Sequence, residues 1–194
     1  MLTGKEFVSD YESNREDIEK WFSIKCPEKY QRFAELLESK GSETTWRNIV
    51  DLYRYDKRLI FNVFRYVSFL EEYLRAIVVR NNEREDAYDQ WQMTKMKQLE
   101  DRIIELHREG KSGIDNGSLE EDIDNVRELR NIISHNRILV ESPYREYLNS
   151  LIRMLPAEYQ ERCRDKLIKC KDDLQIDNCW TNYLDIEMMV TIKC

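Results

Sequence analysis

The stretch of residues 57–80 constrains the fold of this chain more than any other segment. Its apolar residues recur at helical spacing and cover most of the circumference of a helix. They are Leu59, Ile60, Phe61, Val63, Phe64, Val67, Leu70, Leu74, Ile77 and Val78. A narrow polar stripe remains, made of Asn62, Arg65, Ser68, Glu71, Glu72 and Arg75. Because a helix with so little polar surface packs on several sides, we predict a central helix whose polar stripe faces solvent or a cleft.

Turn-forming residues are scarce in the rest of the chain. With only 5 Gly and 3 Pro among 194 residues, an all-β fold is disfavoured. We expect a compact all-α bundle of about seven helices, folded as a single domain over residues 1–194. Capping patterns, prolines and glycines predict further helices at 3–22, 27–41, 83–109 and 118–139. Two more helices should start near Pro143 and Pro156, and another segment leads from 44 into 57–80. We also expect a loop at 110–117 and a short C-terminal segment around Trp180.

Charge and composition argue against several classes of protein. The net charge of -7 is unsuited to coating nucleic acid by bulk charge, although a local basic site remains open. The most apolar stretch, 59–79, contains four charged residues, and the first residues lack the apolar core of a secretion signal, so we expect no membrane span and no export. The five cysteines form no C-x-x-C pair, which favours reduced thiols in the cytoplasm. We expect no metal or other cofactor.

The stretch 125–139 carries the residues with chemical potential. On a helix, Ile123, Val126, Leu129, Ile132 and Ile133 form a buried face, and one polar arc beside it holds Arg127, Arg130, Asn131, Ser134 and His135. Asn131 and His135 are four residues apart, so the amide can orient the imidazole. The arc therefore offers a group that titrates near neutrality, a fixed cation and an orienting amide. These are the groups needed for metal-free acid–base cleavage of a phosphodiester.

The Arg-x4-His spacing occurs twice in the chain. Arg102 and His107 share it, but apolar residues separate them, and no Asn follows the Arg. We interpret His107 as a surface residue near a helix C-terminus. The rarer pattern Arg-Asn-x3-His distinguishes Arg130 to His135 as the candidate site.

The segment Arg130-Asn-Ile-Ile-Ser-His135 resembles the signature of HEPN-domain ribonucleases. The wider stretch 129–139 is similar to the corresponding helix of the bacterial Abi-like (abortive infection) HEPN proteins. Residues 69–77, with a Glu and an Arg, resemble the long helix of the same family. Together the matched segments cover about a fifth of the chain.

The resemblance implies an all-α HEPN-like helical bundle with metal-independent endoribonuclease activity on single-stranded RNA. In that family two copies of the motif meet at a homodimer interface. His135 would move a proton, Arg130 would stabilise the transition-state charge, and Asn131 would position one of them or the phosphate. The products would be a 2′,3′-cyclic phosphate and a 5′-hydroxyl. Family roles in phage defence and as toxins imply a protein or small-RNA antitoxin as a partner. Some HEPN toxins carry a modifiable Tyr two residues after the His, where this chain has Arg137.

Residues around the motif have competing interpretations. Arg127, Ser134 and Arg137 could extend an RNA-binding patch, but surface salt bridges are an equally reasonable use of such arginines. Glu72 and Arg75 could support the site from the long helix, whereas pairing of Glu71 with Arg75 is the simpler alternative.

Three functions therefore remain open from the sequence. The first is the ribonuclease. The second is a non-catalytic HEPN-like helical module that binds RNA or a protein partner and uses the arc to hold a phosphate. The third is a structural or antitoxin-like bundle with a coincidental motif. The acidic net charge favours the second, whereas the titrating His within an intact Arg-Asn-x3-His favours the first.

Overall fold

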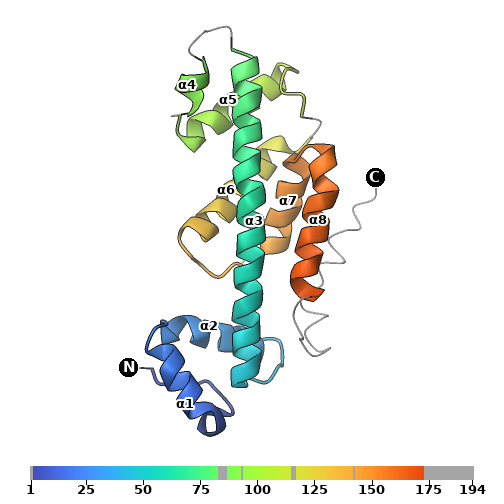
Figure 1. Ribbon diagram of the computed structural model, residues 1–194. Coiled ribbons are helices and arrows are strands. Elements are labelled where there is room, and N and C mark those ends of the chain that lie inside the picture. The colour runs from blue at the N-terminus through green and yellow to red at the C-terminus, as the bar shows by residue number, and fades with distance from the viewer. Residues whose placement is uncertain (1, 83–86, 93, 115–116, 142, 173–194) are drawn as a thin grey trace. The chain divides into compact units, whose positions relative to one another are not determined.

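The computed structural model describes residues 2–82, 87–92, 94–114, 117–141 and 143–172. Over these ranges the chain is all-α and contains no strand, which confirms the predicted fold class. The described helices number eight, against the seven or so predicted, and the shortest has 6 residues. They are α1 (Tyr11–Phe22), α2 (Pro27–Glu38), α3 (Trp46–Arg80), α4 (Ala87–Gln92), α5 (Met96–Arg108), α6 (Leu119–Ser134), α7 (Tyr144–Met154) and α8 (Ala157–Asp172) (Figure 1). The predicted segment around Trp180 lies outside the described residues.

The chain divides into two compact units, and the boundary falls within α3, after Leu59. The first unit contains α1, α2 and the start of α3, together with 168–172 of the described residues. The second unit contains residues 60–167. All residues of the Arg-Asn-x3-His motif belong to the second unit.

Aromatic side chains form the core of the first unit. Trp21 and Phe22, at the end of α1, contact Tyr30 of α2 and Trp46 of α3, with ring centroids 5.5 to 6.4 Å apart. Tyr53 of α3 completes the cluster, 5.1 Å from Tyr30. Edge-on and tilted rings at these separations add to the stabilisation that burial gives.

In the second unit, α3, α5, α6, α7 and α8 all contribute buried apolar side chains. On α6 the predicted buried face is confirmed for all members except Ile133, which is half-buried. Asp122, fully buried in the first turn of α6, pairs with Arg153 of α7. Asn125 also donates a hydrogen bond to Ser150 of α7 (2.9 Å). An ion pair whose carboxylate is fully buried fixes α6 against α7, because removal of the cation would leave that charge unpaired.

The predicted central helix is longer than expected and less completely buried. Its start and the segment leading into it form one helix of 35 residues, α3. Most of its predicted apolar positions are buried, but Ile60 is half-buried, and Phe61 and Phe64 are 64% and 54% exposed. The prediction that these two phenylalanines belong to the core is therefore wrong.

Two other helix predictions need correction. The predicted helix 83–109 contains two described helices, α4 and α5, because Lys95 has an extended backbone (ψ 146°) and caps a new helix. The prolines were more reliable markers: α2 begins at Pro27, and α7 and α8 begin directly after Pro143 and Pro156.

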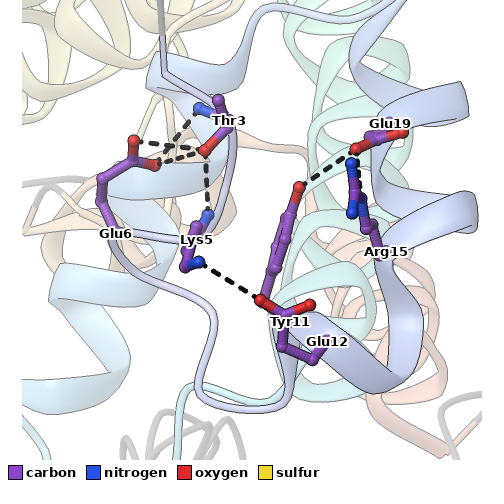
Figure 2. Close-up of polar contacts among 7 residues, drawn as sticks. All are labelled: Thr3, Lys5, Glu6, Tyr11, Glu12, Arg15 and Glu19. Carbon is purple, nitrogen blue, oxygen red and sulfur yellow. Dashed lines mark hydrogen bonds and ion pairs between the residues drawn. The ribbon is translucent and has the colours of Figure 1, made fainter.

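The first helix begins at Tyr11, eight residues later than predicted. The expected contacts between Thr3 and Glu6 do form, since the Thr3 amide donates to Glu6 (3.2 Å), but they close a turn and start no helix (Figure 2). The chain then passes Asp10, whose carboxylate accepts a hydrogen bond from the Trp46 amide (2.7 Å). The start of α3 thus holds the N-terminal segment at Asp10, and α1 begins at the next residue, Tyr11.

Gly4 provides a test of this packing. Its φ is +94°, and a Cβ there would lie 2.9 Å from Ile18, whereas Gly41 (φ +72°) has open space around it. We expect Gly41→Ala to lower the free energy of unfolding by about 1 kcal/mol through backbone strain. Gly4→Ala should lower it by about 3 kcal/mol, because a clash in the core is added. Urea unfolding measures both, and equal losses would show that the N-terminal turn does not pack as described.

Candidate functional site

The candidate site lies at the C-terminal end of α6. This helix starts directly after Ser118, as predicted, but it ends at Ser134, five residues before the predicted end at Leu139. Asn136 has a φ of 51°, and it ends the helix in a Schellman motif. The Asn136 amide donates to the carbonyl of Ile133 (3.1 Å) and the Arg137 amide to that of Ile132 (2.9 Å). Asn adopts this left-handed conformation more readily than most residues, which is why the helix can stop here.

His135 is the capping residue of this helix end. Its amide still donates to the carbonyl of Asn131 (3.0 Å), so its backbone completes the last turn. Its side chain is exposed, and no described residue makes a hydrogen bond to the imidazole. The amide of Asn131 lies 3.5 Å from Glu128. The predicted hydrogen bond from Asn131 to His135 is therefore not formed.

Arg130 is held in place by a carboxylate from α3. Its Nε donates to Oε1 of Glu71 at 2.5 Å, and both side chains are partly buried. The Nη donors of Arg130 have no hydrogen-bond partner among the described residues. The bond from Nε to Glu71 thus orients the guanidinium, and the Nη donors remain available for an anion such as a phosphate.

Glu71 is the residue of this site that sequence reasoning missed. It lies within the segment that resembles the family's long helix, but the sequence favoured its pairing with Arg75 on the same helix. That pairing is wrong: Arg75 donates instead to the backbone carbonyls of Trp91 and Thr94 (3.2 Å for Thr94). A contact between residues 59 apart in the chain leaves no local signal in the sequence.

Arg127 is committed to a structural ion pair. Its Nε and Nη2 donate to Glu100 of α5 at 2.8 and 2.6 Å, and its Nη1 lies 2.9 Å from Asp124. The Glu100 carboxylate is 1% exposed, and its hydrogen bond raises the pKa of Arg127 above the usual value. This geometry favours the salt-bridge interpretation of Arg127 over RNA binding.

The other predicted site residues also differ in their exposure and in their hydrogen-bond or ion-pair partners. Arg137 is exposed beyond the helix end and has no ion-pair partner among the described residues. Ser134 is exposed, and its hydroxyl donates to the carbonyl of Arg130 (2.7 Å). Glu72 is exposed on α3, next to Glu71 but turned about 100° around the helix. The structure therefore brings Glu71 to Arg130, near the helix end that carries His135, whereas Arg75 and Arg127 make structural contacts.

The second Arg-x4-His match has a different setting. Arg102 pairs with Glu105 (2.9 Å), one turn along α5. His107 lies in the last turn, as predicted, but it is half-buried, and its Nδ1 lies 3.2 Å from the Ser112 hydroxyl. His107 is thus a suitable control residue for experiments on His135.

Comparison with known proteins adds no assignment. No protein-family model matches the chain, and neither the curated proteins nor the solved structures give a match. Within the described ranges, no cluster of three or more His, Cys, Asp or Glu side chains could hold a metal ion. None of the helices in those ranges is both long and apolar enough to span a bilayer.

The different settings of the arginines predict different effects on stability. Arg127→Ala should lower the free energy of unfolding by about 3 kcal/mol, because it leaves the Glu100 carboxylate buried without its cation. Arg137→Ala should change it by less than about 0.5 kcal/mol. Adding Glu100→Gln to Arg127→Ala should restore part of the loss, since a neutral amide tolerates burial better. Urea denaturation of the variants checks this, and a negligible loss for Arg127→Ala would contradict the structural role.

Proposed function

We propose that this chain is a metal-independent endoribonuclease of the HEPN type that cleaves single-stranded RNA. The observation that carries the proposal is the end of α6, where Glu71 orients Arg130 and leaves its outer donors unpaired in the described ranges, five residues before the exposed His135. The all-α fold and the Arg-Asn-x3-His pattern agree with the proposal. Arg137 adds an exposed cation two residues after His135.

In the proposed reaction, the ribose 2′-oxygen attacks the adjacent phosphorus while the bond from phosphorus to the 5′-oxygen breaks. His135 accepts the proton of the 2′-hydroxyl, which only RNA possesses. Arg130 stabilises the negative charge that develops on the phosphate oxygens. The leaving 5′-oxygen takes a proton from a second acid. The products are a 2′,3′-cyclic phosphate and a 5′-hydroxyl, so atoms and protons balance.

A homodimer supplies the second acid in this proposal. A single copy has one exposed His135 at the end of α6, whereas two copies related by a two-fold axis would bring two imidazoles and two guanidinium groups to one cleft. One imidazole would act as the base and the other as the acid. Such a nuclease is suited to abortive infection or to a toxin–antitoxin pair, in which a protein or small-RNA partner restrains it.

A second candidate function is a non-catalytic helical module that binds RNA or a protein partner. The specific observation in its favour is the absence of an orienting hydrogen bond to His135 among the described residues, since a catalytic imidazole is usually oriented by a second group. The net charge of -7 also favours a module that relies on a small local cationic site.

Cleavage of end-labelled single-stranded RNA in EDTA tests the proposal. We expect the wild-type chain to cleave it. His135→Ala should lower the rate at least about a hundredfold through loss of proton transfer. Arg130→Ala should lower it by a similar factor through loss of charge stabilisation. The matched control His107→Ala should leave cleavage unchanged.

Two results would contradict the ribonuclease. One is the absence of cleavage by wild-type protein that is folded and dimeric, and the other is cleavage by His135→Ala at the wild-type rate. RNA binding without cleavage would support the second candidate. Because Arg130→Ala also breaks the pair with Glu71, circular dichroism and urea unfolding should accompany the assay.

Glu71 should act as a positioning residue for Arg130. Glu71→Gln keeps the shape of the side chain but removes the charge that holds the guanidinium, so we expect kcat to fall by about tenfold to a hundredfold with a smaller change in KM. Its exposed neighbour provides the control, and Glu72→Gln should leave both constants unchanged. A rise in kcat for Glu71→Gln would show instead that the ion pair holds Arg130 away from the substrate.

A further inference from the structure

Two exposed phenylalanines on α3 have no role in the site described so far. Phe61 and Phe64 are 64% and 54% exposed, although the sequence pattern places them in the core. They are three residues apart and therefore neighbours on one side of the helix. The other large exposed apolar residues in the described ranges, Ile24 and Tyr88, lie on other segments. A single exposed apolar side chain is ordinary, but two adjacent aromatic rings in the middle of a long helix call for a partner.

A cation lies beside these rings. Arg65 follows Phe64 directly, four residues after Phe61, and it is exposed with no ion-pair partner among the described residues. Another side of α3 contacts α8, because the Tyr66 hydroxyl donates to the carbonyl of Arg162 (3.0 Å). Tyr66 is turned about 160° around the helix from Phe64, so the two rings lie away from that contact.

Arg65 has no acidic neighbour at helical spacing. No Asp or Glu stands three or four residues from it along α3, where a carboxylate could pair with it. Glu71 and Glu72 lie six and seven residues away, about two turns along the helix. The surface made by Phe61, Phe64 and Arg65, called the α3 aromatic surface below, therefore combines two aromatic rings with an unpaired cation.

The α3 aromatic surface lies on the same side of α3 as the candidate site. Phe64 and Glu71 are seven residues apart, which places them about 10 Å apart along the helix and within about 20° around it. Glu71 holds Arg130. About three stacked nucleotides, at roughly 3.4 Å each, would span the distance from Phe64 to the level of Arg130.

We propose that the α3 aromatic surface binds unpaired RNA bases by stacking on Phe61 and Phe64, with Arg65 neutralising a flanking phosphate. This inference rests on the proposed ribonuclease function and specifies how that site selects its substrate. Aromatic rings stack on bases of any identity, but only where the bases are not paired in a duplex. The surface would therefore make single-stranded RNA the preferred substrate without reading its sequence.

A second copy of the chain suits this surface less well than RNA. The two rings together bury at most about 500 Å² per copy, whereas a stable interface buries about 800 Å² on each partner. A two-fold contact centred on the rings would also bring Arg65 of each copy toward the other without a carboxylate between them. RNA supplies both the flat apolar bases and the negative phosphates that this surface lacks.

Fluorescence anisotropy with a labelled 12-nucleotide single-stranded RNA tests the inference. The full chain carrying His135→Ala serves as the parent, in EDTA, so that the RNA stays intact. Adding Phe61→Ala and Phe64→Ala should raise the Kd at least about tenfold. Adding Tyr88→Ala instead, which removes an equally exposed ring on α4, should leave the Kd unchanged. Both phenylalanines are exposed, so circular dichroism should show an unchanged fold.

The charge contribution has its own readout. Arg65→Gln should weaken binding and reduce the slope of log K against log salt by about 0.7. Arg80→Gln, which alters an exposed arginine four turns further along α3, should change neither quantity. The parent should also bind a duplex RNA of the same length more weakly than the single strand.

Three outcomes separate this inference from the proposed function. Unchanged RNA binding by the double phenylalanine variant would overturn the α3 aromatic surface, even if the wild-type chain cleaves RNA. Loss of the dimer by that variant in sedimentation would also overturn it and identify the surface as a contact between copies. RNA binding that depends on Phe61 and Phe64 in a wild-type chain that cleaves no RNA would support the surface and overturn the ribonuclease.

Discussion

The burial of one face of α3 is the constraint on which the second unit depends. Val63, Val67, Leu70, Leu74 and Ile77 recur at intervals of three and four residues and are almost fully buried. Each such side chain contributes about 1.5 to 3 kcal/mol when it leaves water, so the register of α3 cannot shift by one residue without a large loss. This register places Glu71 beside the buried face, where it reaches Arg130 on α6. The candidate site thus depends on apolar packing that contains none of its chemistry.

The burial of the partner carboxylate determines the role of each arginine in the second unit. Arg127 and Arg153 meet carboxylates that are almost fully buried, Glu100 and Asp122, and a buried charge must keep its partner. Arg130 meets the partly exposed Glu71 through one nitrogen only, so it is oriented and still able to bind an anion. Arg65 and Arg137 have no such partner in the described ranges and remain available to a ligand. In a chain with a net charge of -7, cationic sites arise wherever folding leaves an arginine out of this pairing.

The sequence predicts the parts of the fold that local chemistry determines. Helices marked by Pro27, Pro143 and Pro156 begin where expected, because proline fits the first turn and fixes its own φ. The predicted start of α1 and the predicted end of α6 were wrong, because each depends on a competing local structure. These structures are a turn between Thr3 and Glu6 and the left-handed conformation of Asn136. The motif residues could be found by their spacing on one helix. The pairing of Arg130 with Glu71 and the exposure of Phe61 could not, because both depend on which distant segments cover α3.

The end of α6 indicates why the proposed nuclease site would need more than one chain. A Schellman motif satisfies the last carbonyls with the amides of Asn136 and Arg137, so those amides cannot also bind a phosphate. His135 is left exposed, and no described residue orients its imidazole. An exposed imidazole in water is a weak catalyst until a second group fixes its direction and excludes solvent. In the proposed nuclease, the RNA substrate and a second copy of the motif are the two groups that would do so, and binding of either would complete the proposed catalytic geometry.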